Sequence, residues 1–180
     1  MAWLRRDDFL QAGLDILAGK GSEGLTIASL CETLAISKGS FYHHFDGMAD
    51  YVDALLQYWE VQINDRSIAI SEDEPEPMTQ IPVLTEIAVA LPHATEAALR
   101  AWGESNPVVA AAQARVDSAR TARILEVILS LGIEKNKGAL LTDLAVSLLV
   151  GFQHQDPKDL GRLRAMLDEV NRLIYLEISS

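Results

Sequence analysis

The stretch Ser37-Lys-Gly-Ser-Phe-Tyr-His-His-Phe45 places a lysine, a tyrosine and two adjacent histidines just after a short turn. On a helix with about 100° per residue, Phe41 and Phe45 fall on one side and define a buried face. The opposite side then carries small and polar side chains. We therefore expect a helix starting at Ser37 that presents a polar surface to its surroundings, made of Lys38, Gly39, Ser40, Tyr42 and His43.

The two histidines of this stretch do not have the spacing of a metal site. Adjacent helical histidines diverge by about 100°, whereas zinc-binding pairs on a helix usually stand four residues apart. No third histidine or carboxylate has ligand spacing nearby, so we expect no metal and no cofactor. The start of a helix instead favours an anion such as phosphate. A helical hairpin whose histidines are merely solvated remains the alternative at this point.

The sequence around this stretch is helical throughout. Residues 9–17 carry an apolar stripe at i, i+3, i+4, i+7, and Thr26 is expected to cap a short helix before Ser37. A helix follows Gly47, and the acidic, proline-containing residues 71–78 are expected to form a loop. Further helices are expected at about 79–91, 93–103, 107–131, 137–154 and 158–177. No segment alternates with period two, so the fold class is all-α.

The chain of 180 residues is acidic, with a net charge of −11. Acidic surfaces repel phosphate, so any nucleic-acid contact would need a local patch. The single cysteine, Cys31, excludes an internal disulfide and suits a reducing compartment. We see no signal peptide, and the apolar residues 138–152 are shorter than the roughly 20 that a membrane span needs. We therefore expect a cytoplasmic protein with no membrane partner.

The run LTIASLCETLAISKGSFYHHFDGMADYVDALL, residues 25–56, resembles the N-terminal domain of TetR-family (tetracycline-repressor type) transcriptional regulators. The resemblance extends over about residues 5–58. It implies a three-helix helix-turn-helix domain at 1–46 and a larger helical ligand-binding and dimerisation domain at 47–180. It also implies a homodimer that binds a palindromic double-stranded DNA operator and is released by a small-molecule effector, most simply as a repressor. The implied DNA-binding residues are Thr26, Ser37, Lys38, Gly39, Ser40, Tyr42 and His43.

Two residues depart from the family pattern, and the charge of this region also bears on DNA binding. Ala35 stands in the turn where the family usually has glycine, and a left-handed alanine there would cost about 1 kcal/mol. Met48 stands where the family commonly has a lysine that contacts phosphate. Residues 1–58 hold four lysines and arginines against eight acids, a balance of −4. These features predict weak or salt-sensitive DNA binding.

Two expected helices in the C-terminal part each carry an apolar stripe, and each stripe is expected to pack against another helix. The family usually dimerises through its last two helices, which implies an interface made of Leu144, Leu148, Gly151, Leu163, Leu167, Val170 and Ile174. Packing of these stripes within the monomer is the alternative. The family's usual effector pocket implies as ligand-binding candidates Tyr58, Trp59, Met78, His93, Trp102 and Phe152.

Two other kinds of protein remain open. Met48 and the acidic balance favour an interaction module of the same fold that has lost DNA binding. A small helical hydrolase could use His93, or His154 with the nearby Asp156, but no nucleophile motif supports it. We therefore expect a regulator and not an enzyme.

Overall fold

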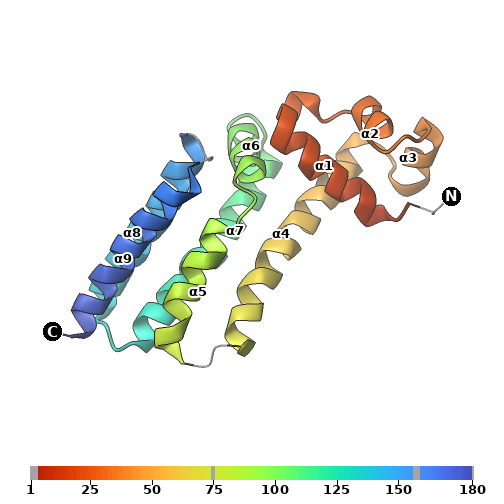
Figure 1. Cartoon of the computed structure of the whole chain (residues 1–180). Helices are drawn as coiled ribbons and strands as arrows, with labels where there is room; N and C mark the ends of the chain where they lie inside the picture. The colour runs from red at the N-terminus through yellow and green to blue at the C-terminus, as the bar shows by residue number, and fades with distance from the viewer. Residues whose placement is uncertain (1–3, 74–75, 156–158, 180) are drawn as a thin grey trace. The chain divides into compact units, whose positions relative to one another are not determined.

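The computed structural model describes residues 4–73, 76–155 and 159–179, and these contain helices and no strands. The expected all-α fold is confirmed. The helices, shown in Figure 1, are α1 (Arg6–Lys20), α2 (Ile27–Thr33), α3 (Lys38–His44), α4 (Met48–Asp73), α5 (Pro77–Val89), α6 (His93–Gly103), α7 (Pro107–Ser130), α8 (Lys135–His154) and α9 (Leu160–Ile178). A single 3-10 turn, η1 (Ser22–Gly24), separates α1 from α2.

The helix boundaries agree with those expected from the sequence except around residues 71–78. The five helices expected beyond that segment are present, with described ends within about two residues of the prediction; the expected start at residue 158 lies outside the described residues. The loop prediction is wrong at both ends, because residues 71–73 continue α4 and residues 77–78 begin α5. Residues 74–75 lie outside the described residues. Pro77 stands in the first turn of α5, where a missing N–H costs nothing.

The chain divides into two compact units, each built from two separate segments. The first unit contains Met1–Gln62 and Ala94–Ala114, and the second contains Ile63–His93 and Arg115–Ser180. The domain boundary expected between residues 46 and 47 stays a prediction.

An aromatic cluster forms the core of the first unit beneath α3. Phe41 and Phe45 are almost completely buried, with ring centroids 5.3 Å apart, and Phe45 lies 5.0 Å from the ring of Tyr51. The Tyr51 hydroxyl donates to the carbonyl of Phe9 at 2.8 Å, and burial raises the pKa of this hydroxyl. A Cβ at Gly13 would stand 1.9 Å from the Tyr51 hydroxyl oxygen, so this close approach requires glycine. The cluster fixes α3 against α1 and α4.

The core of the second unit lies between α5, α7, α8 and α9. One cluster of buried residues in this core is made of Ile81, Val127, Ile128, Leu141, Val170 and Ile174. α8 and α9 lie side by side, and α5 also contacts α9 (Figure 1). The apolar stripe of α9 is therefore used inside the unit.

Candidate functional site

Two capped short helices and the turn between them form a helix-turn-helix in the first unit. The hydroxyl oxygen of Thr26 accepts from the backbone N–H of Ser29 at 3.1 Å, and the Ser29 hydroxyl accepts from the N–H of Thr26 at 3.0 Å. This reciprocal capping confirms Thr26 as the cap of α2. The Ser37 hydroxyl accepts from the N–H of Ser40 at 3.3 Å and caps α3. Both helix starts thus follow from short hydroxyl side chains at the right positions.

The turn closes α2 through a Schellman motif with Ala35 at its left-handed position. The N–H of Ile36 donates to the carbonyl of Cys31 at 2.9 Å, and the N–H of Ala35 donates to the carbonyl of Glu32 at 3.2 Å. Ala35 has φ 52°, in the left-handed region where glycine is usual. The expected strain at this turn is therefore present.

Replacing Ala35 with glycine is expected to stabilise the protein by about 0.5–1 kcal/mol. The left-handed conformation costs an L-residue about 1–2 kcal/mol, and the greater freedom of glycine in the unfolded chain offsets part of the gain. Urea denaturation followed by circular dichroism measures the change. Ala28→Gly, at an exposed position within α2, is the matched control and should instead lose about 1 kcal/mol. Equal losses in both variants would contradict the assigned turn geometry.

The outward side of α3 is polar and open to solvent. Lys38, Gly39 and His43 are exposed, Ser40 is half-buried, and 56% of Tyr42 is exposed. An added Cβ at Gly39 would touch only the Ser37 hydroxyl oxygen, at 3.6 Å. Thr26 and Ser37 are also exposed. The seven predicted DNA-binding residues thus surround the turn and the start of α3, and their contacts with DNA stay a prediction.

The charges near α3 are sparse and partly paired. Nη2 of Arg6 lies 3.9 Å from a carboxylate oxygen of Asp50, and the guanidinium carbon lies 4.9 Å from the ring centroid of Phe45. The charge of Arg6 therefore interacts with both the carboxylate and the ring. Met48, the first residue of α4, is half-buried. Lys38 remains the cation that α3 itself offers to solvent. A nucleic acid docking on this face would therefore rely on hydroxyls, His43 and backbone N–H groups as much as on lysine.

The second unit encloses a mainly apolar cavity of about 80 Å³. Its walls come from α4, α5, α7, α8 and α9, and include Ile63, Ile81, Leu84, Ile124, Ile128, Leu149 and Ile174. Four polar side chains also line it: Thr85, Arg120, Arg123 and Asn171. Because every one of its lining residues belongs to the second unit, the cavity is a property of that unit alone.

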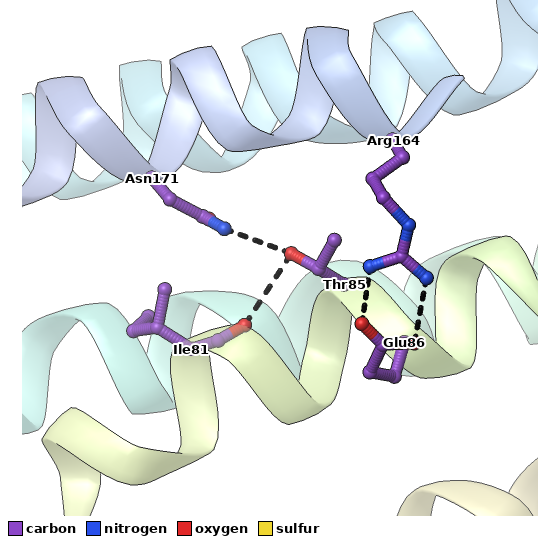
Figure 2. Close-up of polar contacts among 5 residues, drawn as sticks. All are labelled: Ile81, Thr85, Glu86, Arg164 and Asn171. Atoms are coloured by element: carbon purple, nitrogen blue, oxygen red, sulfur yellow. Dashed lines mark hydrogen bonds and ion pairs between the residues drawn. The ribbon is translucent and has the colours of Figure 1, made fainter. Parts of the chain in front are cut away.

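Polar contacts between α5 and α9 hold one wall of the cavity. Asn171 donates from its side-chain amide to the Thr85 hydroxyl oxygen at 2.9 Å, as Figure 2 shows. On the same pair of helices, Arg164 donates to both carboxylate oxygens of Glu86. These bonds, together with the positive charge of Arg164, hold the pKa of the Glu86 carboxyl below its usual value. The bidentate geometry fixes the register of α5 on α9.

The six ligand-binding candidates from the sequence are divided between the two units. Tyr58, Trp59 and Trp102 belong to the first unit, whereas Met78, His93 and Phe152 belong to the second. None of the six lines the cavity. The ring of His93 is buried 5.1 Å from that of Phe152, Trp59 is 1% exposed, and Met78 is 44% exposed. The sequence analysis did not single out Arg120 and Arg123, which line the cavity. Their position between buried Val116 and Val127, on one otherwise apolar stripe of α7, is the sequence signal that could have indicated them.

The seven dimer candidates divide into a buried and a more exposed group. Leu163, Leu167, Val170 and Ile174 are at most 6% exposed in the single chain, so the alternative of packing within the monomer describes these four. Leu144 is exposed, and Leu148 and Gly151 are half-buried. A Cβ added at Gly151 would meet no atom within 4 Å. Other exposed large apolar side chains on these two helices are Leu140, Leu160, Tyr175 and Leu176.

Within residues 4–73, 76–155 and 159–179, no three His, Cys, Asp or Glu side chains gather in a metal-binding group. His154 is exposed at the end of α8, and Asp156 lies outside the described residues. The searched helices contain none that is long and apolar enough to cross a membrane.

The fold and the exposed α3 face define a helix-turn-helix protein. Residues 9–55 match a family model described as bacterial regulatory proteins, tetR family. The helix-turn-helix of this chain is therefore similar to that of the tetR family of bacterial regulatory proteins.

Two known proteins are similar to about half of this chain. The nucleoid occlusion factor SlmA of Aliivibrio fischeri (strain MJ11) is 31% identical over 87 residues, which are 48% of this chain and 44% of SlmA. The HTH-type transcriptional regulator UidR of Escherichia coli (strain K12) is 30% identical over 112 residues, which are 59% of this chain and 55% of UidR. The chain spans about half the length of these relatives.

A solved structure extends the likeness to nearly the whole chain. The transcriptional regulator FadR from Bacillus subtilis, in complex with stearoyl-CoA, superposes with a TM-score of 0.68 at 13% identity, covering 94% of this chain and 97% of FadR. At this identity the likeness concerns the fold alone. UidR and FadR are both described as transcriptional regulators.

Proposed function

We propose that this chain is a transcriptional repressor that binds a palindromic DNA operator as a homodimer. The single observation that carries the proposal is the polar, solvent-exposed face of α3 above a buried aromatic anchor. Exposed Lys38, Tyr42 and His43 can donate to phosphate oxygens and base edges, while Phe41 and Phe45 hold the helix in place. A protein of this kind meets its DNA in the cytoplasm, where we expect it to act.

A dimer follows from the way such a helix reads DNA. Two recognition helices separated by one DNA turn, about 34–36 Å, read the two halves of a palindrome. Exposed Leu140 and Leu144 share one side of α8 with Ser147 and Gly151, whose small side chains permit close helix approach. We propose this side of α8 as the dimer surface, in place of the buried α9 stripe.

An effector bound in the cavity of the second unit would release the operator. FadR, which shares the fold, was solved with stearoyl-CoA, and this supports ligand binding by this fold. α4 carries residues of both units, so a change at its C-terminal end can alter the placement of α3. A coupling of about 1–3 kcal/mol, typical of allosteric proteins, would lower operator affinity about 5–150-fold.

The test is selection of bound fragments from random DNA by the purified protein at about 50 and about 200 mM salt. Recovery of a palindrome whose affinity falls steeply with salt is the expected result. An interaction module that has lost DNA binding is the second candidate, favoured by Met48 and by the balance of −4 over residues 1–58. Absence of any enriched sequence at the lower salt concentration would support that candidate and contradict the repressor.

Replacing Met48 with lysine is expected to tighten DNA binding and to steepen its salt dependence. A lysine at this position would add one phosphate contact per protomer, which changes the slope of log K against log salt by about −0.9 per protomer. Fluorescence anisotropy with labelled operator over a salt series measures both effects. Ala49→Lys is the matched control, because it adds the same charge about 100° around the helix. Equal slopes in the two variants would exclude a specific contact at residue 48.

A further inference from the structure

We propose that the cavity of the second unit binds an amphipathic monoanion, with an apolar tail among its aliphatic side chains and a carboxylate head at Arg123 and Arg120. This inference deepens the proposed function, because it names the chemical class of the effector. It concerns this chain's own lining residues and does not depend on the ligand of any similar protein.

The charge of the lining is the first reason. The described residues that line the cavity include two arginines and no aspartate or glutamate. This contrasts with the whole chain, which has a net charge of −11. Positive charge beside an apolar cavity is costly unless an anion compensates it. A ligand that brings one negative charge and an aliphatic tail fits both parts of this lining.

An unsatisfied donor on Arg123 is the second reason. One terminal nitrogen of its guanidinium, Nη2, donates to the side-chain oxygen of Gln80 at 2.9 Å, and Nη1 donates to Glu126 at 2.9 Å. The remaining nitrogen, Nε, is buried and has no hydrogen-bond acceptor. Buried donors are nearly always paired, so an orphan on a cavity-lining residue indicates a missing acceptor. A carboxylate oxygen is the strongest acceptor for guanidinium.

Glu126 does not remove the need for that acceptor. The Glu126 side chain is 70% exposed, whereas the side chain of Arg123 is 18% exposed. The Glu126 carboxylate therefore accepts from Nη1 of Arg123 on the solvent side, and Nε of Arg123 stays without an acceptor. An anion in the cavity would complete the pairing of the opposite edge.

Arg120 adds a second cation on the same side of α7. It stands three residues before Arg123, and residues at this spacing are neighbours on one helix face. Its side chain is 11% exposed, and Nη1 lies 3.3 Å from a carboxylate oxygen of Asp117. Arg120 thus contributes to the positive potential at this end of the cavity while Asp117 holds it in position.

The neutral polar groups of the cavity are already paired. Asn171 donates to the Thr85 hydroxyl, and that hydroxyl donates to the carbonyl of Ile81 at 3.5 Å (Figure 2). A ligand gains little from these two side chains, so recognition of its head falls to the arginines. The cavity of about 80 Å³ is several times the space that one water needs, and it suits a short or medium chain.

The experiment measures binding of octanoate, octanol and octylammonium to the full chain in the absence of DNA, by calorimetry and thermal shift. Octanoate is expected to bind with one site per chain, octanol at least tenfold more weakly, and octylammonium not at all. Arg123→Gln should weaken octanoate at least tenfold, whereas Arg172→Gln should leave it unchanged. Arg172 is the matched control because its guanidinium is exposed and pairs with Glu169 on α9. Arg120→Gln provides a second test if Arg123→Gln does not fold.

Equal binding of octanol and octanoate would overturn the proposal, as would unchanged octanoate binding in both Arg123→Gln and Arg120→Gln. Operator binding is measured separately, so that a failure of the ligand class can be told apart from a failure of the proposed repressor function. Octanoate binding that depends on Arg123 supports the ligand class even if DNA binding is absent. Operator binding without octanoate binding leaves the repressor in place and contradicts the ligand class.

Discussion

Replacing Phe41 with alanine is expected to lower the free energy of unfolding by about 3–5 kcal/mol. Phe41 is 0% exposed, and its ring contacts those of Phe9, Phe45 and Tyr51 at centroid distances of 6.5, 5.3 and 5.7 Å. Alanine would leave a cavity between α1, α3 and α4 that these rigid rings cannot fill. Chemical denaturation followed by circular dichroism measures the loss.

The neighbouring residue supplies the control for this prediction. Tyr42→Ala removes an equally large ring that is 56% exposed, and should change the free energy of unfolding by less than about 1 kcal/mol. Similar losses in the two variants would mean that α3 is rotated relative to the described structure. The face assigned to DNA would then be wrong as well.

The double variant Tyr42→Ala and His43→Ala is expected to lower operator affinity about 100-fold without lowering the melting temperature appreciably. Both side chains are exposed on α3, so their loss costs little packing. Each is proposed to donate to a phosphate oxygen, and a hydrogen bond to a charged group contributes about 1.5–3 kcal/mol. The loss of two such bonds, at the lower end of this range, corresponds to about 100-fold. Fluorescence anisotropy with the selected operator measures the affinity.

The control for the double variant is His154→Ala, which removes an exposed histidine from α8. It should bind operator as the unchanged protein does. If the double variant keeps its DNA affinity while its association with protein partners changes, the interaction module becomes the better interpretation. If it loses both DNA binding and its melting transition, the assigned exposure of Tyr42 and His43 is incorrect.

Local structure in the first unit could be predicted from the sequence because each signal acts over a few residues. Thr26 and Ser37 cap the helices that follow them, and the burial of Phe41 and Phe45 follows from their four-residue spacing. The strained turn at Ala35 could also be anticipated, since a missing glycine leaves the left-handed position to a residue with a Cβ. These features need no knowledge of distant contacts.

Features that depend on tertiary packing could not be predicted in this way. An apolar stripe such as that of α9 shows that one face is buried, but it does not show whether the partner is α5, α8 or another chain. The cavity arises where α4, α5, α7, α8 and α9 meet, so the position of Arg120 and Arg123 in its lining is defined only when these helices are in place. The acidic residues 71–73 lack an apolar stripe and yet continue α4, because such a pattern does not oppose a helix.

The division of the chain has a consequence for synthesis on the ribosome. The first unit needs Ala94–Ala114, which is translated only after the whole segment Ile63–His93 of the second unit. Buried Leu99, Val109 and Ala112 belong to that late segment. The first unit therefore cannot be completed as soon as residues 1–62 leave the exit tunnel. Folding of the two units is interleaved in time, and a nascent chain that stops before residue 114 would expose part of the first core to chaperones and proteases.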